Sequence, residues 1–255
     1  TATTELWRRG EFLNYILDAT QQEMVRNFRA SEEYVYIWLA SRRIGKSVTL
    51  IGVSIEQAMA NPDSRILYLS KTSDNTLEII DQASSVILKD CPADMAPTFH
   101  KGENKFKFKN GSEIRIKGLD NTGPDVIRGV GADLVIFDEF CFMRHLSEIV
   151  SSVVMPMIIE RGGRVLMGST PPKTPGHDSI EWIQRAEAND AITVRNIYDC
   201  PRWTNKQIVA FAREAGGVDS DIFKREYMAQ IVVSRDAAIL PSFTDSRREK
   251  MVMAI

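Results

Sequence analysis

The chain has 255 residues, of which 44% are hydrophobic and 26% charged, and its formal net charge is −2. This composition is typical of a soluble globular protein. The balanced charge excludes binding of nucleic acid through bulk positive charge, so any such contact needs a local patch.

No apolar run reaches the roughly 18–20 residues of a membrane span, and the first ten residues show no secretory signal. Three cysteines far apart in the sequence predict reduced thiols and no zinc site.

Apolar patterning predicts helices that alternate with short buried strands. The expected helices cover 11–28, 46–60 and 73–89, and the expected strands cover 34–40, 65–70, 133–137, 164–167 and 191–197. This alternation predicts an α/β fold with a mostly parallel central sheet flanked by helices. The pattern breaks up after Arg235, so we expect one domain over 1–235 and a linker, or the start of a further domain, over 236–255.

The segment 105–117 predicts an antiparallel β-hairpin, because polar and apolar residues alternate on both sides of Asn110-Gly111. Its basic residues share one face, and they are Lys105, Lys107, Lys109, Arg115 and Lys117. Such a strip could follow a DNA backbone without reading its sequence. Charge on a hairpin face is, however, more often a solvated surface.

The strongest local motif lies between a predicted strand and a predicted helix. It reads Ala40-Ser41-Arg42-Arg43-Ile44-Gly45-Lys46-Ser47 and resembles a phosphate-binding loop, with Ala40 in place of the usual first glycine. Backbone N–H groups at such a helix start cradle phosphate. We expect Lys46 to reach the β- and γ-phosphates of ATP and Ser47 to bind Mg²⁺.

A second motif follows about ninety residues further on, where the apolar strand 134–137 ends in Asp138 and Glu139. Ligands bind at the carboxyl edge of a parallel sheet. Asp138 is therefore expected to hold the magnesium ion, and Glu139 to polarise the attacking water.

With both motifs in place, nearly the whole chain resembles the ATPase domain of large terminase subunits from tailed bacteriophages. The resemblance implies a P-loop NTPase fold of the ASCE type, with Ser41-Arg42-Arg43-Ile44-Gly45-Lys46-Ser47 as its phosphate loop. It implies that Arg42 senses the γ-phosphate. In this family a glutamine reads adenine, and here that is Gln21, with Gln22 nearly as suitable.

The resemblance extends to two later segments. Arg128, ten residues before Asp138, matches an arginine finger that acts on the ATP of a neighbouring subunit, with Arg144 and Arg161 as rivals. Ser169 and Thr170 match the motif that couples hydrolysis to movement.

The resemblance implies an ATPase that moves double-stranded viral DNA into the procapsid. The implied setting is the host bacterial cytoplasm, with the portal protein and the small terminase as partners. The active form is expected to be a homo-oligomeric ring, and a monomer stays open for the isolated chain. No nuclease activity is expected of this fragment, although full-length members carry a nuclease domain. Two alternatives remain open: a superfamily 2-type, nucleic-acid-stimulated ATPase, and a structural subunit that binds a nucleotide without hydrolysing it.

Overall fold

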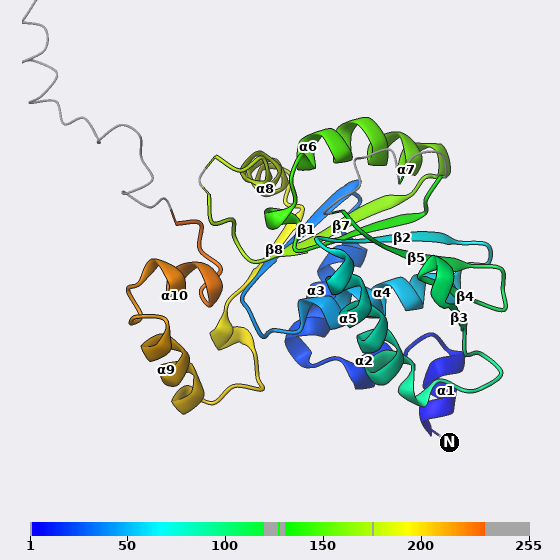
Figure 1. Cartoon of the computed structure of the whole chain (residues 1–255). Helices are drawn as coiled ribbons and strands as arrows, with labels where there is room; N and C mark the ends of the chain where they lie inside the picture. Colours follow the sequence, from blue (N-terminus) through cyan, green and yellow to red (C-terminus); the bar gives the residue numbers. More distant parts are fainter. Residues whose placement is uncertain (1, 120–126, 128–130, 175, 233–255) are drawn as a thin grey trace, which may run out of the picture.

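The fold is built on one sheet of eight strands, in the order β3-β4-β5-β2-β6-β7-β1-β8 (Figure 1). The computed structural model describes residues 2–119, 127, 131–174 and 176–232. The strands are β1 Val35–Ala40, β2 Arg65–Ser70, β3 Thr98–His100, β4 Lys105–Lys107, β5 Glu113–Gly118, β6 Leu134–Asp138, β7 Arg164–Ser169 and β8 Ile192–Arg195. All pairings from β5 to β8 are parallel, and β3-β4-β5 are antiparallel.

The central strands are buried on both faces, as their continuous apolar sequences predict. Every residue of β6 is buried, and so is every residue of β7 after its first. Strand β7 lies between β1 and β6. Because β2, β6, β7 and β1 are neighbours and run parallel, their carboxyl ends meet along one edge of the sheet.

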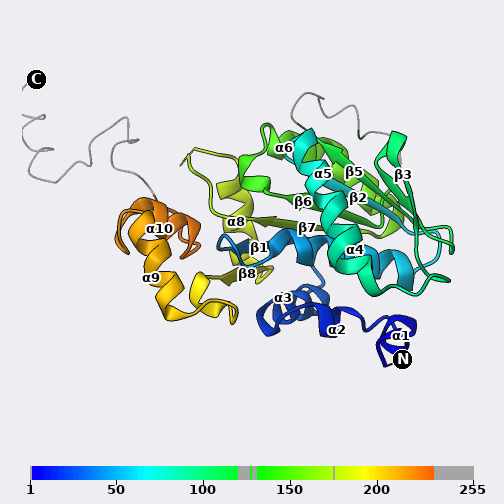
Figure 2. The same cartoon turned by 60° about the horizontal axis from the view of Figure 1, so that its bottom comes forward.

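Helices cover both faces of the sheet (Figures 1 and 2). On one side lie α1 Ala2–Arg8, α2 Leu13–Ile16, α3 Ala19–Ala30, α4 Lys46–Ala60 and α5 Ser73–Gln82. On the other side lie α6 Leu146–Glu148, α7 Met155–Arg161 and α8 Ser179–Ala188. None of the described helices is long and apolar enough to cross a membrane.

A small helical unit follows β8 and stands beside the sheet (Figure 2). It contains α9 Asn205–Glu214 and α10 Asp221–Glu226. Its own apolar core, separate from the main one, is formed by Ile197, Ile208, Ala212, Ala215 and Phe223. The predicted domain boundary at 235 and the predicted linker lie outside the described residues.

The predicted helix over 11–28 is wrong as a single element, because the chain breaks at Asp18. The Asp18 carboxylate accepts a hydrogen bond from the backbone N–H of Gln21, and the Gln21 side chain accepts one from the N–H of Asp18. This capping box begins a new helix. The predicted helix over 73–89 becomes a π-helix at Ala83–Ile87 and then a 3-10 turn.

The predicted hairpin is confirmed, since β4 and β5 pair antiparallel with Phe106 opposite Ile114. Both of these side chains are buried. The sequence did not predict β3, because three residues are too few to show a period.

Candidate active site

The phosphate loop joins the end of β1 to the start of α4. Gly45 caps the helix with φ 85°, and Arg43 has φ 65°. A side chain at position 45 would collide with the amide of Gln21, so the loop requires glycine at this position for space as well as for conformation. The predicted strand–loop–helix context is therefore confirmed.

Lys46 is buried at the base of the loop. Its Nζ donates to the carbonyl oxygens of Ala40 and Ser41, at 3.1 Å each. It also lies 3.9 Å from Oε1 of Glu139. The loop lysine and the strand-end carboxylate thus lie within ion-pair distance of each other. They were predicted from motifs about ninety residues apart.

Asp138 is buried at the end of β6. The Tyr68 hydroxyl donates to Oδ2 of Asp138 at 3.0 Å, whereas Oδ1 has no hydrogen-bond partner among the described residues. Burial, and then the charge of Glu139, raise the pKa of Asp138 from 3.8 to about 6, against the lowering effect of the Ser47 and Tyr68 hydroxyls.

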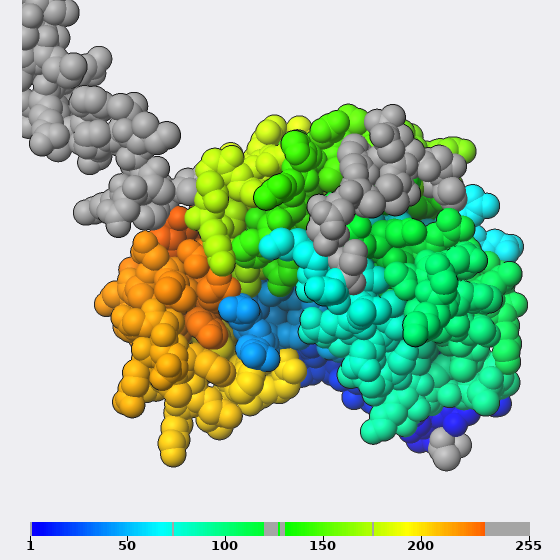
Figure 3. Space-filling view, viewed as in Figure 1, coloured from blue at the N-terminus to red at the C-terminus, as the bar shows by residue number. Residues whose placement is uncertain are grey.

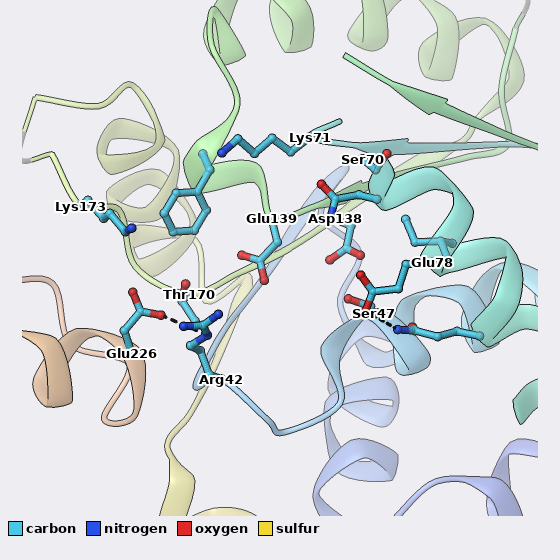
Figure 4. A pocket seen from close by; sticks show the side chains of 14 residues that line it. Arg42, Ser47, Ser70, Lys71, Glu78, Asp138, Glu139, Thr170, Lys173 and Glu226 are labelled. Carbon is cyan, nitrogen blue, oxygen red and sulfur yellow. Dashed lines mark hydrogen bonds and ion pairs between the residues drawn. The ribbon is translucent and has the colours of Figure 1, made fainter. Parts of the chain in front are cut away.

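The pairing of Ser47 with Asp138 suits a magnesium ion, which prefers oxygen ligands and keeps several waters. Both side chains point into the same part of the cleft (Figure 4). Across the described residues, no group of three or more His, Cys, Asp or Glu could hold a metal. Ser47 and Asp138 would hold Mg²⁺, and Oδ1 of Asp138, which has no hydrogen-bond partner among the described residues, is free to take part.

Glu139 follows β6 in a left-handed conformation, with φ 62°. Its N–H donates to the carbonyl of Gly168 at 2.7 Å, and its Oε2 accepts a hydrogen bond from Ser169 Oγ at 3.0 Å. Ser169 Oγ accepts in turn from the N–H of Cys141 at 3.3 Å. Strained backbone of this kind is typical of functional sites. It turns the carboxylate out of the strand and into the cleft.

These residues open onto a cleft of about 440 Å³ (Figures 3 and 4). In Figure 3 the light-blue loop is visible between the orange C-terminal helices and the cyan segment around α5. The predicted residues in its wall are Arg42, Ser47, Asp138, Glu139 and Thr170. The rest of the wall was not predicted: Ser70, Lys71, Asn75, Glu78, Ile79, Gln82, Phe142, Lys173 and Glu226.

Arg42 joins the loop to the helical unit. Its N–H donates to the carbonyl of Glu226 at 2.7 Å, and its Nε lies 3.6 Å from the Glu226 carboxylate. The Arg43 carbonyl accepts from Arg202 Nη2 and Trp203 Nε1. The loop is thus held by the segment that follows β8. Ile44 is packed in the core, and the Ser41 Oγ is buried with no partner among the described residues.

Gln21 lies behind the phosphate loop and does not line the cleft. It is 4% exposed. Its Nε2 donates to the carbonyl of Gly45 at 3.2 Å, while its Oε1 caps α3. Gln22 instead donates to Asn14 and Leu17. The structure therefore assigns the Gln21 amide to the backbone of the loop, and adenine reading by either glutamine stays a prediction.

Two lysines that sequence reasoning missed flank one aromatic ring at the cleft. Lys71 Nζ lies 5.8 Å and Lys173 Nζ 5.9 Å from the centroid of Phe142. Both follow strands, β2 and β7, that neighbour β6. Lys71 comes directly after the predicted strand 65–70, and Lys173 lies in the segment that follows the predicted strand 164–167. These positions were the signal that could have found them, because residues that follow parallel strands gather at one edge.

Of the other predicted arginines, Arg144 and Arg161 do not line the cleft, and neither does the basic strip. Arg161 binds Asp133 at 3.0 Å. Arg128 lies outside the described residues. In the hairpin, Lys105 pairs with Glu103 and Glu113, Arg115 pairs with Glu113, and Lys109 donates to a carbonyl.

The order of the strands and the loop at β1 define the class of the protein. One strand separates the phosphate-loop strand from the strand that ends in Asp138-Glu139, as in P-loop NTPases of the ASCE type. Residues 37–241 match the family model described as "Terminase large subunit, T4likevirus-type, N-terminal". The chain therefore belongs to the large terminase family and corresponds to its N-terminal ATPase region.

Solved structures of phage terminases share this fold. The ATPase domain of the Thermus phage P74-26 large terminase is 18% identical, with a TM-score of 0.67 over 87% of this chain and 98% of that one. The large terminase of the HK97 bacteriophage is 12% identical, with a TM-score of 0.68 over 86% of this chain and 53% of that one.

A large terminase from a thermophilic bacteriophage, solved in complex with ADP, is 14% identical, with a TM-score of 0.69 over 89% of this chain and 59% of that one. This chain thus spans a little over half of the longer terminases it resembles. No curated protein sequence matches it.

Proposed function

We propose that this chain hydrolyses ATP with magnesium, and that hydrolysis drives double-stranded viral DNA into the procapsid. The observation that carries the proposal is the arrangement of Glu139. Its carboxylate is anchored by Ser169 and lies 3.9 Å from Lys46, in the same cleft as Asp138. A lysine for phosphate, a carboxylate for metal and a second carboxylate for water are the parts that phosphoryl transfer to water requires.

Each residue has a defined task in this proposal. Lys46 leaves the carbonyls of its own loop for the β- and γ-phosphates, which are stronger acceptors because they are charged. Bound Mg²⁺, held by Ser47 and Asp138, would neutralise charge on the phosphates. Glu139 orients the attacking water and accepts its proton. Arg42 lies in the wall of the cleft, where its guanidinium pairs with Glu226. When ATP is bound, the guanidinium contacts the γ-phosphate in place of Glu226.

Coupling and assembly extend the proposal beyond the single cleft. Ser169 and Thr170 couple loss of the γ-phosphate to movement at the edge of the sheet. Ser169 donates to Glu139, and Thr170 lines the cleft. Arg128 of a neighbouring copy completes the site in a homo-oligomeric ring. The ring acts in the host bacterial cytoplasm with the portal protein and the small terminase.

DNA contact is proposed for the hairpin strip. Among the described residues, Lys107 and Lys117 have no ion-pair partner, whereas Lys105 and Arg115 are partly neutralised by Glu113. The contact therefore depends chiefly on Lys107 and Lys117.

The test is DNA-stimulated ATP turnover measured against protein concentration, for the wild type and Arg128→Ala. We expect turnover per subunit to rise with concentration and to collapse in Arg128→Ala. Adding inactive Glu139→Gln subunits, which still carry Arg128, should then restore activity to Arg128→Ala. Flat turnover with a normal Arg128→Ala variant would remove the shared site, and no turnover by the wild type would remove the ATPase itself.

A further inference from the structure

Tyr68, which no motif predicted, lies directly behind the magnesium-binding carboxylate. It belongs to β2, and its register partner on β6 is Ile136. Side chains two residues apart in a strand share a face, so Tyr68, Ile136 and Asp138 all point to the same side of the sheet. The phenol can therefore reach along the sheet from Tyr68 to the end of β6.

The Tyr68 hydroxyl is committed to Asp138. Tyr68 is fully buried and donates to Oδ2 of Asp138 at 3.0 Å. No other hydrogen bond to this hydroxyl is present among the described residues. A buried hydroxyl without an acceptor is costly, so this contact fixes the phenol and the carboxylate together.

This contact makes the two oxygens of the Asp138 carboxylate different. Oδ2 is occupied by Tyr68, and Oδ1 is buried with no partner among the described residues. Asp138 and Ser47 line the same cleft. Oδ2 has already given one of its acceptor sites to Tyr68, whereas Oδ1 keeps its full acceptor capacity for a metal ion, or for a water bound to it, on the side of Ser47.

We propose that Tyr68 is a positioning residue for the magnesium site: its hydroxyl holds the Asp138 carboxylate so that Oδ1 is presented to Mg²⁺ beside Ser47. The proposal rests on the proposed function, because it names the partner of the same metal-binding residue. Tyr68 is fully buried and does not line the cleft, so it acts only through Asp138. Such outer partners orient metal ligands, and losing one typically weakens metal affinity about 10- to 100-fold.

The chain offers a matched control in Tyr36. It is also buried on a strand of the same sheet, and its hydroxyl shares a 2.8 Å hydrogen bond with Thr193 Oγ1. Tyr36 does not line the cleft. Tyr36→Phe and Tyr68→Phe therefore remove the same group from similar surroundings, but only Tyr68→Phe alters the surroundings of Asp138.

The experiment measures Mn²⁺ affinity in the presence of ATP-γ-S, by electron paramagnetic resonance of free Mn²⁺, for these variants and Asp138→Asn. Nucleotide affinity in EDTA is measured beside it. We expect Tyr68→Phe to weaken Mn²⁺ binding about 10- to 100-fold, with Tyr36→Phe unchanged. Nucleotide affinity in EDTA should not change in either tyrosine variant.

Wild-type Mn²⁺ affinity in Tyr68→Phe, or an equal loss in Tyr36→Phe, would overturn the inference. Should Tyr68→Phe fail to fold, Tyr68→Met takes its place with the same expectation, because methionine fills buried space without a donor. If Asp138→Asn also binds Mn²⁺ normally, the magnesium site of the proposed function fails. If only Asp138→Asn loses Mn²⁺, that site stands and the role of Tyr68 falls.

Discussion

The hydrogen bond from Ser169 to Glu139 gives the site a contact whose removal has a calculable effect on turnover. Ser169→Ala deletes a 3.0 Å bond to a carboxylate and leaves the N–H of Cys141 without its acceptor. Hydrogen bonds to charged groups contribute roughly 1.5–3 kcal/mol. The Glu139 side chain is 37% exposed, so water replaces part of this interaction and the lower end of the range applies.

A loss of about 1.5–2 kcal/mol corresponds to a fall in kcat of roughly ten- to thirtyfold. We expect the affinity for ATP-γ-S to stay unchanged, because Ser169 holds the catalytic carboxylate and not the nucleotide. Single-turnover hydrolysis and equilibrium binding separate the two quantities.

The matched control is Ser54→Ala, which removes another buried hydroxyl, bonded to the carbonyl of Leu50 within α4. Normal kcat in Ser169→Ala would refute the reasoning. A loss of ATP-γ-S affinity with kcat intact would instead place Ser169 on the γ-phosphate.

Gln21, Asp138 and the basic strip each give a further prediction. Gln21→Ala should weaken ATP and GTP binding to the same extent, because the Gln21 amide donates to the Gly45 carbonyl and not to a base. A loss of ATP affinity with GTP affinity intact, measured by competition binding, would instead show that Gln21 reads adenine. Asp138→Asn should raise the free energy of unfolding at pH 7 by up to about 3 kcal/mol. The reason is that the pKa of Asp138 is raised from 3.8 to about 6 in the folded protein. Ionisation of this carboxyl group therefore opposes folding as pH rises through this interval, and asparagine does not ionise. Chemical denaturation should show this gain vanishing below pH 4, and an equal gain at both pH values would contradict the cause. Reversing charge at Lys107 and Lys117 should lower DNA affinity and reduce its salt dependence, with Lys206→Glu on α9 as control; unchanged DNA-stimulated turnover would exclude the strip.

The sheet and the ends of its strands were predictable because buried parallel strands have a simple sequence pattern. The segments at β1, β2, β6 and β7 all appear as short apolar runs, and the carboxyl ends of such strands meet at one edge. That rule is sufficient to bring Lys46, Asp138 and Glu139 together. It also explains why Lys71 and Lys173 were within reach of the same reasoning.

The parts that could not be predicted depend on contacts between side chains far apart in the sequence. Nothing in the sequence near Tyr68 indicates that its hydroxyl meets Asp138, because the contact depends on the register of β2 against β6. The links from Glu226 to Arg42 and from Trp203 to Arg43 likewise need the position of the helical unit. The break at Asp18 was missed because the apolar spacing continues across it, whereas the capping box of Asp18 and Gln21 begins a new helix at this point.

Hydrolysis at this cleft is tested most directly by Glu139→Gln, with Glu214→Gln on the exposed part of α9 as control. Glutamine keeps the shape of the side chain and can still accept from Ser169, but it is a far weaker base. The measurement is single-turnover hydrolysis of ATP with Mg²⁺, together with the ATP affinity of each variant. We predict that Glu139→Gln binds ATP as tightly as the wild type and hydrolyses it at least about 100-fold more slowly, with Glu214→Gln normal. Hydrolysis by Glu139→Gln at the wild-type rate would contradict the assignment of this carboxylate and of the cleft it faces.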